Sequence, residues 1–151
     1  MATEYSGNQS LLSLPKTAFL ASSTIPVEMV LRCYDWAAKM RDEGRCVISG
    51  FSSRMEKDVW NMLIGGSQPI ILVLAREMYK RIPSELQQLL DANRLLIIST
   101  ASTPRQSRAT AFARNKFICE QADNILFVGV NEQSSLHPLK TSFSDKIITL
   151  T

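Results

Sequence analysis

The sequence predicts an α/β fold: a three-layer sandwich, with a mainly parallel sheet of about six strands and helices on both faces. Short apolar runs alternate along the chain with segments that have the periodicity of an α-helix. Most of these runs are apolar at successive positions, which is typical of strands covered on both faces. Repeated strand–helix–strand units favour parallel pairing with right-handed crossovers.

The expected strands are short and rich in aliphatic side chains. They are residues 17–21, 46–49, 70–74, 95–98, 125–130 and 147–150. Residues 1–15 are polar and turn-rich, so we expect a loose N-terminal lead-in there. No long linker divides residues 16–151, which therefore predict a single domain.

The first expected helix covers residues 26–43, where apolar side chains recur at helical spacing. Pro26 suits a first turn and Gly44 suits the position after the last turn. Further helices are expected to begin near Ser53 and near Pro83, and another to cover residues 110–122. The apolar stripe of the first helix consists of Val27, Val30, Leu31, Tyr34 and Ala38.

Composition excludes several classes of protein. The chain has 151 residues, of which 45% are hydrophobic and 21% charged, as in ordinary globular domains. No apolar run is long enough to span a bilayer and no signal peptide is recognisable, so we expect a cytoplasmic protein without a membrane partner. The three cysteines lack the spacing of a zinc site or a disulfide framework, and the net charge of +3 does not by itself imply nucleic acid.

Catalytic constellations are missing as well. A single histidine, His137, leaves no Cys–His pair or Ser–His–acid triad, and no metal ligands are expected. Glu56, near the start of the second helix, is the one acid–base candidate, and its position also suits the helix dipole. We therefore expect a protein that is not an enzyme and has no catalytic residues.

Candidate ligand-binding residues lie in loops that follow the strands, because ligands of such sheets bind beyond the carboxyl ends of the strands. We expect the loops after the first, second, fourth and fifth predicted strands to converge on one pocket. It would be lined by Ser22, Gly50, Ser53, Thr100 and Gly129. In the second of these loops, Ser49, Gly50, Ser52 and Ser53 precede a helix and are candidates to hold a phosphate, or else form a simple capped turn.

Residues 92–119 contain five basic side chains and no acidic one. This asymmetry indicates either a solvated surface or an anion site. Arg114 and Asn115 lie on or beside the packed face of their helix, so their partners are either loop carbonyls or a ligand. An exposed Phe51 ring would add a stacking surface. The basic residues of the segment are Arg94, Arg105, Arg108, Arg114 and Lys116.

Several segments resemble the DNA-processing protein A (DprA/Smf) family, above all its short single-domain relatives. Residues 48–57, I-S-G-F-S-S-R-M-E-K, resemble the family's S-G-x-A-x-G-I-D and the relatives' G-F-H-S-P-M-E-K. Residues 68–76 resemble Q-P-V-I-x-x-x-A-R, and residues 113–118 resemble the family's R-N-R helix start. The R-I-P at 81–83 and the A-D at 122–123 also match, so the resemblance extends in order from Thr17 to Val130.

The resemblance implies a Rossmann-like domain that binds single-stranded DNA, with Arg114, Asn115 and Lys116 in the binding region. We expect DNA or a bound nucleotide or phosphate as ligand, no other cofactor, and leave a homo-oligomer open. The P-G-G-x-G-T-x-x-E motif of the related phosphoribohydrolases is missing. Two alternatives stay open: an enzyme or sensor for a small nucleotide derivative, and an interaction module whose site has decayed.

Overall fold

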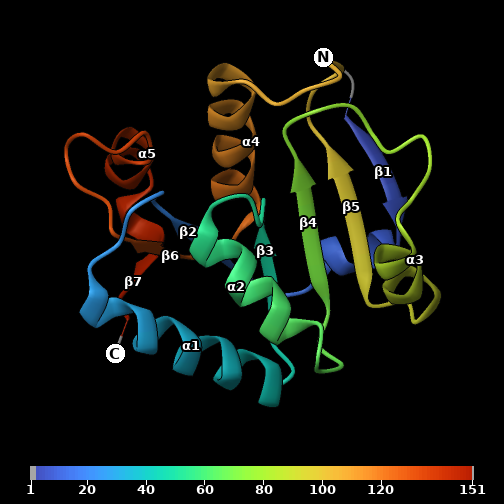
Figure 1. The fold of residues 1–151 in the computed structure, drawn as a ribbon, viewed down its shortest axis with the longest axis horizontal. Coiled ribbons are helices and arrows are strands. Elements are labelled where there is room, and N and C mark those ends of the chain that lie inside the picture. The colour runs from blue at the N-terminus through green and yellow to red at the C-terminus, as the bar shows by residue number, and fades with distance from the viewer. Residues whose placement is uncertain (1–2, 151) are drawn as a thin grey trace.

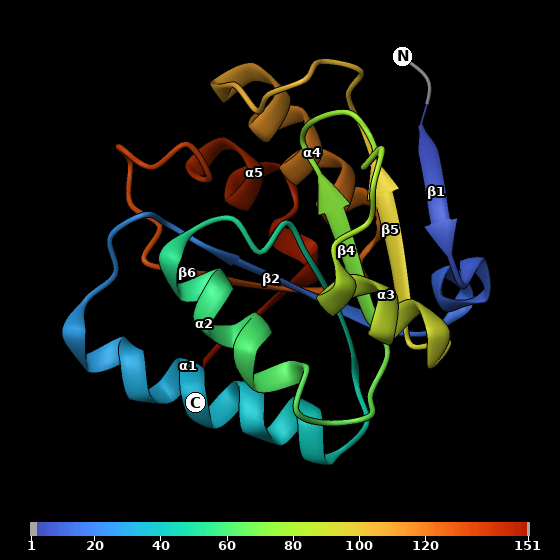
Figure 2. The same ribbon diagram turned by 45° about the vertical axis from the view of Figure 1, so that its right-hand side comes forward.

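A seven-stranded sheet forms the middle layer of the computed structural model, which describes residues 3–150 (Figures 1 and 2). The predicted α/β fold is confirmed, since all strand pairs except the one formed by the first strand are parallel. The strands are β1 (Glu4–Gly7), β2 (Lys16–Ala21), β3 (Cys46–Ser49), β4 (Ile70–Leu74), β5 (Leu95–Ser99), β6 (Asn124–Val128) and β7 (Ile147–Ile148).

The sheet order is β1-β5-β4-β3-β2-β6-β7. From β2 the chain steps outward through β3, β4 and β5, and it then returns past β2 to form β6 and β7. Thr17 of β2 accordingly pairs with Val47 on one side and with Asn124 on the other. The direction of winding therefore reverses beside β2, which is where ligands bind in sheets of this kind.

Helices cover both faces of the sheet, and alternate strand residues serve the two layers. Phe19 and Ala21 of β2 pack into the core shared with α1, α2 and α3. Ala18 and Leu20 of the same strand pack into the core shared with α4 and α5. The helices are α1 (Val27–Asp42), α2 (Arg54–Leu63), α3 (Ser84–Asp91), α4 (Arg108–Gln121) and α5 (His137–Ser142).

The N-terminal residues differ from the expected loose lead-in. Glu4–Gly7 forms the antiparallel edge strand β1 against β5, and Gln9–Ser13 forms a 3-10 turn whose Leu11 is buried. Because an edge strand has one neighbour and mostly exposed side chains, Glu4–Gly7 carries no apolar run that would have predicted it.

The apolar stripe expected for the first helix is also wrong in part. Val27 and Leu31 are 85% and 70% exposed, whereas Cys33 and Ala37 are fully buried. The buried face is rotated toward smaller side chains, which let α1 approach the sheet and α2 closely. Trp36 from this helix stacks on Phe19, with ring centroids 5.1 Å apart.

Candidate functional site

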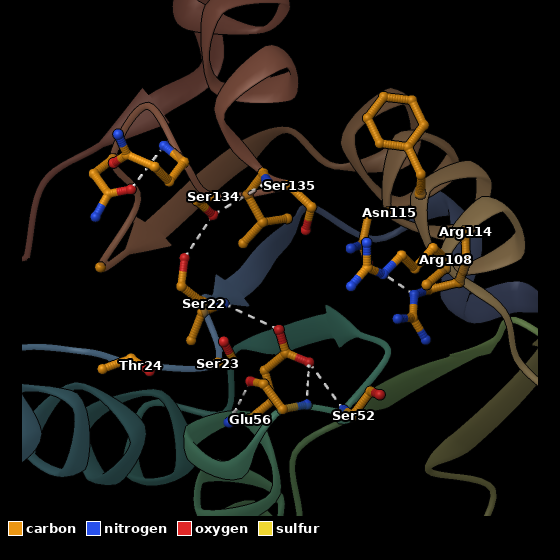
Figure 3. A pocket seen from close by; sticks show the side chains of 18 residues that line it. Ser22, Ser23, Thr24, Ser52, Glu56, Arg108, Arg114, Asn115, Ser134 and Ser135 are labelled. Atoms are coloured by element: carbon orange, nitrogen blue, oxygen red, sulfur yellow. Dashed lines mark hydrogen bonds between the residues drawn. The ribbon is translucent and has the colours of Figure 1, made fainter.

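A cavity of about 700 Å³ opens at the carboxyl ends of β2 and β6, beside the reversal of winding (Figure 3). Its walls come from the loop after β2, the start of α2, the first turns of α4 and the loop after β6. Of the predicted site residues, the cavity is lined by Ser22, Ser52, Ser53, Arg108, Arg114, Asn115 and Gly129.

Glu56 holds the start of α2 and the end of β2 together. Ser53 caps the helix, and the Glu56 carboxylate completes a capping box by accepting the Ser53 N–H at 3.2 Å. The same carboxylate accepts the N–H of Ser52 at 2.9 Å and the N–H of Ala21 at 3.0 Å. With 4% exposure and both oxygens engaged, Glu56 is a structural anion rather than a free base.

This arrangement corrects the expected phosphate cradle at the start of α2. The N–H groups of Ser52 and Ser53 that would hold a phosphate already donate to Glu56. Ser49 does not line the cavity, and its buried hydroxyl accepts the N–H of Phe51 at 3.1 Å. The loop is therefore a capped turn whose anion comes from its own helix.

Arg114 is the buried cation of the site, at 3% exposure. Its Nε donates to Asn115 Oδ1 at 2.7 Å and its Nη1 donates to the carbonyl of Val73 at 3.4 Å. Burial lowers the pKa of Arg114, and the negative charge of Glu56 acts in the opposite direction. Within residues 3–150 no hydrogen bond engages Nη2, so this nitrogen remains available to a ligand in the cavity that Arg114 lines.

The hydrogen bond from Arg114 also determines the orientation of the Asn115 side-chain amide. Because the amide oxygen accepts the guanidinium N–H, the amide nitrogen is left as a donor for the cavity. Arg108, exposed in the first turn of α4, adds a second guanidinium on the same side (Figure 3). The α4 wall thus presents donors and positive charge.

The opposite wall consists of hydroxyl groups. The hydroxyls of Ser22 and Ser134 are hydrogen-bonded at 2.7 Å, which joins the loop after β2 to the loop after β6. Gly129 permits this junction: its φ is +69°, and a Cβ there would lie 3.0 Å from the Thr24 carbonyl oxygen. The sequence interpretation missed the lining residues Asn131, Gln133, Ser134 and Ser135, although Ser134-Ser135-Leu136 resembles the start of the family's G-S-L-x-T-A segment.

The loop after β5 does not join the cavity as expected. Thr100 is buried and donates its hydroxyl to the Leu74 carbonyl at 2.9 Å. Arg105 is exposed outside the cavity, and this loop contributes to the rim through a 3.3 Å hydrogen bond from Gln106 to the Ser52 hydroxyl. The physical reason is the strand order, because β3 and β4 separate β5 from β2.

The remaining predicted residues do not line the cavity. Gly50 lies beneath the Arg114 guanidinium, and Lys116 is exposed on α4. Phe51 offers no stacking surface, because it is 7% exposed and packs against Trp60 with ring centroids 5.0 Å apart.

The described residues hold neither a metal-binding cluster nor a membrane span. Among residues 3–150, no three histidine, cysteine or carboxylate side chains gather as metal ligands would. None of the helices in that range has both the length and the apolar character needed to cross a membrane.

Comparison of the sequence with protein-family models and with curated proteins finds no match. Comparison of the structure finds DNA processing protein A (DprA) from Streptococcus pneumoniae, with a TM-score of 0.76 at 16% identity over 97% of this chain. The match covers 54% of that protein, so this chain spans about half its length. DprA from Helicobacter pylori, described for its single-stranded DNA binding mode, matches with a TM-score of 0.73 at 14% identity, over 97% of this chain and 70% of that one.

A third similar structure belongs to a different class of binding protein. The molybdenum cofactor carrier protein from Chlamydomonas reinhardtii matches with a TM-score of 0.55 at 9% identity, over 89% of this chain and 75% of that one. Its lower score fits a shared α/β architecture with different details. Over nearly its whole length, the chain has the fold of the DprA structures.

Proposed function

We propose that the chain binds single-stranded DNA by its phosphate groups, in the cavity between α2, α4 and the loop after β6. The observation that carries the proposal is the cationic, donor-rich wall formed by Arg108, Arg114 and Asn115. The one carboxylate that lines the cavity, Glu56, accepts three backbone N–H groups and forms no salt bridge with either arginine.

A phosphate suits this wall for chemical reasons. Guanidinium groups pair with phosphate oxygens through short charge-assisted hydrogen bonds, and the side-chain amide supplies a further donor. One of the Ser22 and Ser134 hydroxyls donates to the other, and the accepting hydroxyl keeps its own proton for the anion. The exposed Arg105 and Lys116 would reach phosphates outside the cavity.

The single-stranded DNA binding of the H. pylori DprA supports this choice of ligand for a chain of the same fold. Base contacts are not needed for such binding, since phosphate contacts position a strand without reading its sequence.

Fluorescence anisotropy with a labelled twelve-residue oligothymidylate tests the proposal. If Arg105, Arg108, Arg114 and Lys116 all contact phosphates, the logarithm of the association constant should fall with the logarithm of the salt concentration. The expected slope is near −3, from roughly −0.7 per phosphate contact. A binding curve without salt dependence, or no binding at low salt, contradicts the proposal.

A second candidate function is the binding of one small nucleotide derivative. The observation that favours it is the cavity volume of about 700 Å³, which lies in the range of sites that hold single small molecules. Titration calorimetry with mononucleotides separates the two functions. Saturation by a mononucleotide, with weak oligonucleotide binding, supports the small-molecule function. If neither ligand binds, the remaining interpretation is an interaction module.

A further inference from the structure

A second cavity, of about 310 Å³, lies beside the first and shares one wall with it. Ser22, Ser23 and Thr24, in the loop after β2, line both cavities. Figure 3 shows these residues at the edge of the first cavity that is nearest α1 and α2. The remaining walls of the second cavity come from α1, from the start of α2 and from Ile25.

The lining of the second cavity includes three apolar side chains and one carboxylate, next to hydroxyl groups and the guanidinium of Arg54. Ile25, Val30 and Met55 supply aliphatic and thioether surface. Asp58 is half-buried, and its Oδ2 accepts the Tyr34 hydroxyl at 3.0 Å. That hydrogen bond to Asp58 raises the pKa of Tyr34, so the phenol keeps its proton and holds the carboxylate in place.

The other carboxylate oxygen is available. Within residues 3–150 no hydrogen bond engages Asp58 Oδ1, and Oδ2 accepts one donor only. Arg54, also in the lining, forms no salt bridge with Asp58 within 4.0 Å in the described part of the chain. The carboxylate thus offers two neighbouring acceptors beside an apolar surface.

We propose that this second cavity is a base-binding subsite that prefers guanine, next to the phosphate site. The inference rests on the proposed function. Guanine alone among the DNA bases presents two adjacent donors, N1–H and the 2-amino group, on its Watson–Crick edge, and a carboxylate can accept both. Adenine, cytosine and thymine each present only one donor group on this edge, with an acceptor next to it. They would therefore leave one carboxylate oxygen unpaired.

In this proposal the two neighbouring cavities bind two parts of one nucleotide. A phosphate held by Arg108 and Arg114 and a base held by Asp58 would bracket the loop of Ser22, Ser23 and Thr24. The aliphatic side chains would cover the face of the base, and the phenol of Tyr34 would fix the carboxylate that reads its edge.

The test compares three hexanucleotides in anisotropy: all-thymine, thymine with one central guanine, and thymine with one central hypoxanthine, which lacks the 2-amino group. We expect the guanine oligonucleotide to bind about tenfold more tightly than the all-thymine one, and hypoxanthine to lose most of that gain. Asp58→Asn should abolish the preference while the all-thymine affinity stays within twofold. Asp35→Asn should retain the preference for guanine. It makes the same charge change at an exposed position of α1 that has no side-chain hydrogen bond in the described residues.

A preference that persists in Asp58→Asn, or its absence in the unaltered protein, overturns the guanine subsite and leaves phosphate binding intact. Calorimetry with guanosine and cytidine monophosphates provides a second readout. If neither these nucleotides nor any oligonucleotide binds, both the subsite and the proposed function are wrong.

Discussion

The guanidinium of Arg114 lies directly over the α-carbon of Gly50. A Cβ at position 50 would lie 2.5 Å from Cζ of Arg114, a separation that real side chains do not tolerate. Glycine at the end of β3 therefore provides the room in which α4 places its buried cation. The loop after β3 and the helix α4 therefore pack as one structural unit, although the two residues are 64 positions apart in the sequence.

Gly50→Ala should therefore displace Arg114. We expect the free energy of unfolding to fall by about 1–3 kcal/mol, as in other overpacked sites, and oligonucleotide binding to weaken with it. Urea denaturation and anisotropy measure the two effects. Gly65→Ala is the matched control, since a Cβ there meets only the Met62 carbonyl oxygen at 3.5 Å. Equal effects of the two substitutions would contradict the packing of Arg114 on Gly50.

Glu56→Gln should destabilise the junction between β2 and α2. In the unaltered protein both carboxylate oxygens accept backbone N–H groups. The amide of glutamine has only one acceptor oxygen, so its NH₂ group would face a backbone N–H that is left without an acceptor. We expect a loss of about 1–3 kcal/mol in the free energy of unfolding. Glu28→Gln, an exposed acid in the first turn of α1, should cost less than about 1 kcal/mol. A loss no larger than that of Glu28→Gln would refute the anchoring role of Glu56.

The buried cysteines predict a loss of stability at alkaline pH. Burial raises the pKa of the Cys33 thiol to about 11 and that of Cys46 and Cys119 to about 12. The unfolded chain releases these protons from about pH 9 while the folded chain keeps them, so stability is fully present below pH 9 and falls as pH rises above it.

Each thiol should contribute about 1.4 kcal/mol per pH unit between pH 9 and its pKa in the folded protein. Urea denaturation at pH 8, 9 and 10 under reducing conditions measures the decline. Cys33→Ala removes one buried thiol and should reduce the slope by that amount, which separates the cysteines from other groups that titrate there. An unchanged slope would show that Cys33 does not titrate as described.

Much of the fold could be predicted from the sequence because buried strands need continuous apolar runs. Each of the six expected runs contains or overlaps a strand. β1 was not predicted, because Glu4–Gly7 is held in the sheet by backbone hydrogen bonds to β5 and not by apolar side chains. α1 was placed correctly, but small buried residues such as Ala37 define its inner face, and hydrophobicity alone favoured Leu31.

The residues that line the cavity were predictable only where a single segment of the sequence carries the signal. Strand ends indicated Ser22 and Gly129, and the charge asymmetry indicated Arg108 and Arg114. The position of Glu56 at a helix start was predictable, but its contact with the Ala21 N–H was not, because that contact depends on how α2 packs against the end of β2. The same applies to the Gly50–Arg114 packing, which no local pattern encodes.

The most direct measurement compares two exposed arginines near the start of α4. Arg108, the first residue of α4, lines the cavity, whereas Arg105, in the loop before α4, lies outside it. We expect Arg108→Ala to weaken oligothymidylate binding by at least tenfold, since a charge-assisted hydrogen bond contributes about 1.5–3 kcal/mol, and Arg105→Ala to weaken it threefold or less. Equal losses in the two folded variants, or none in Arg108→Ala, would contradict phosphate binding in the cavity.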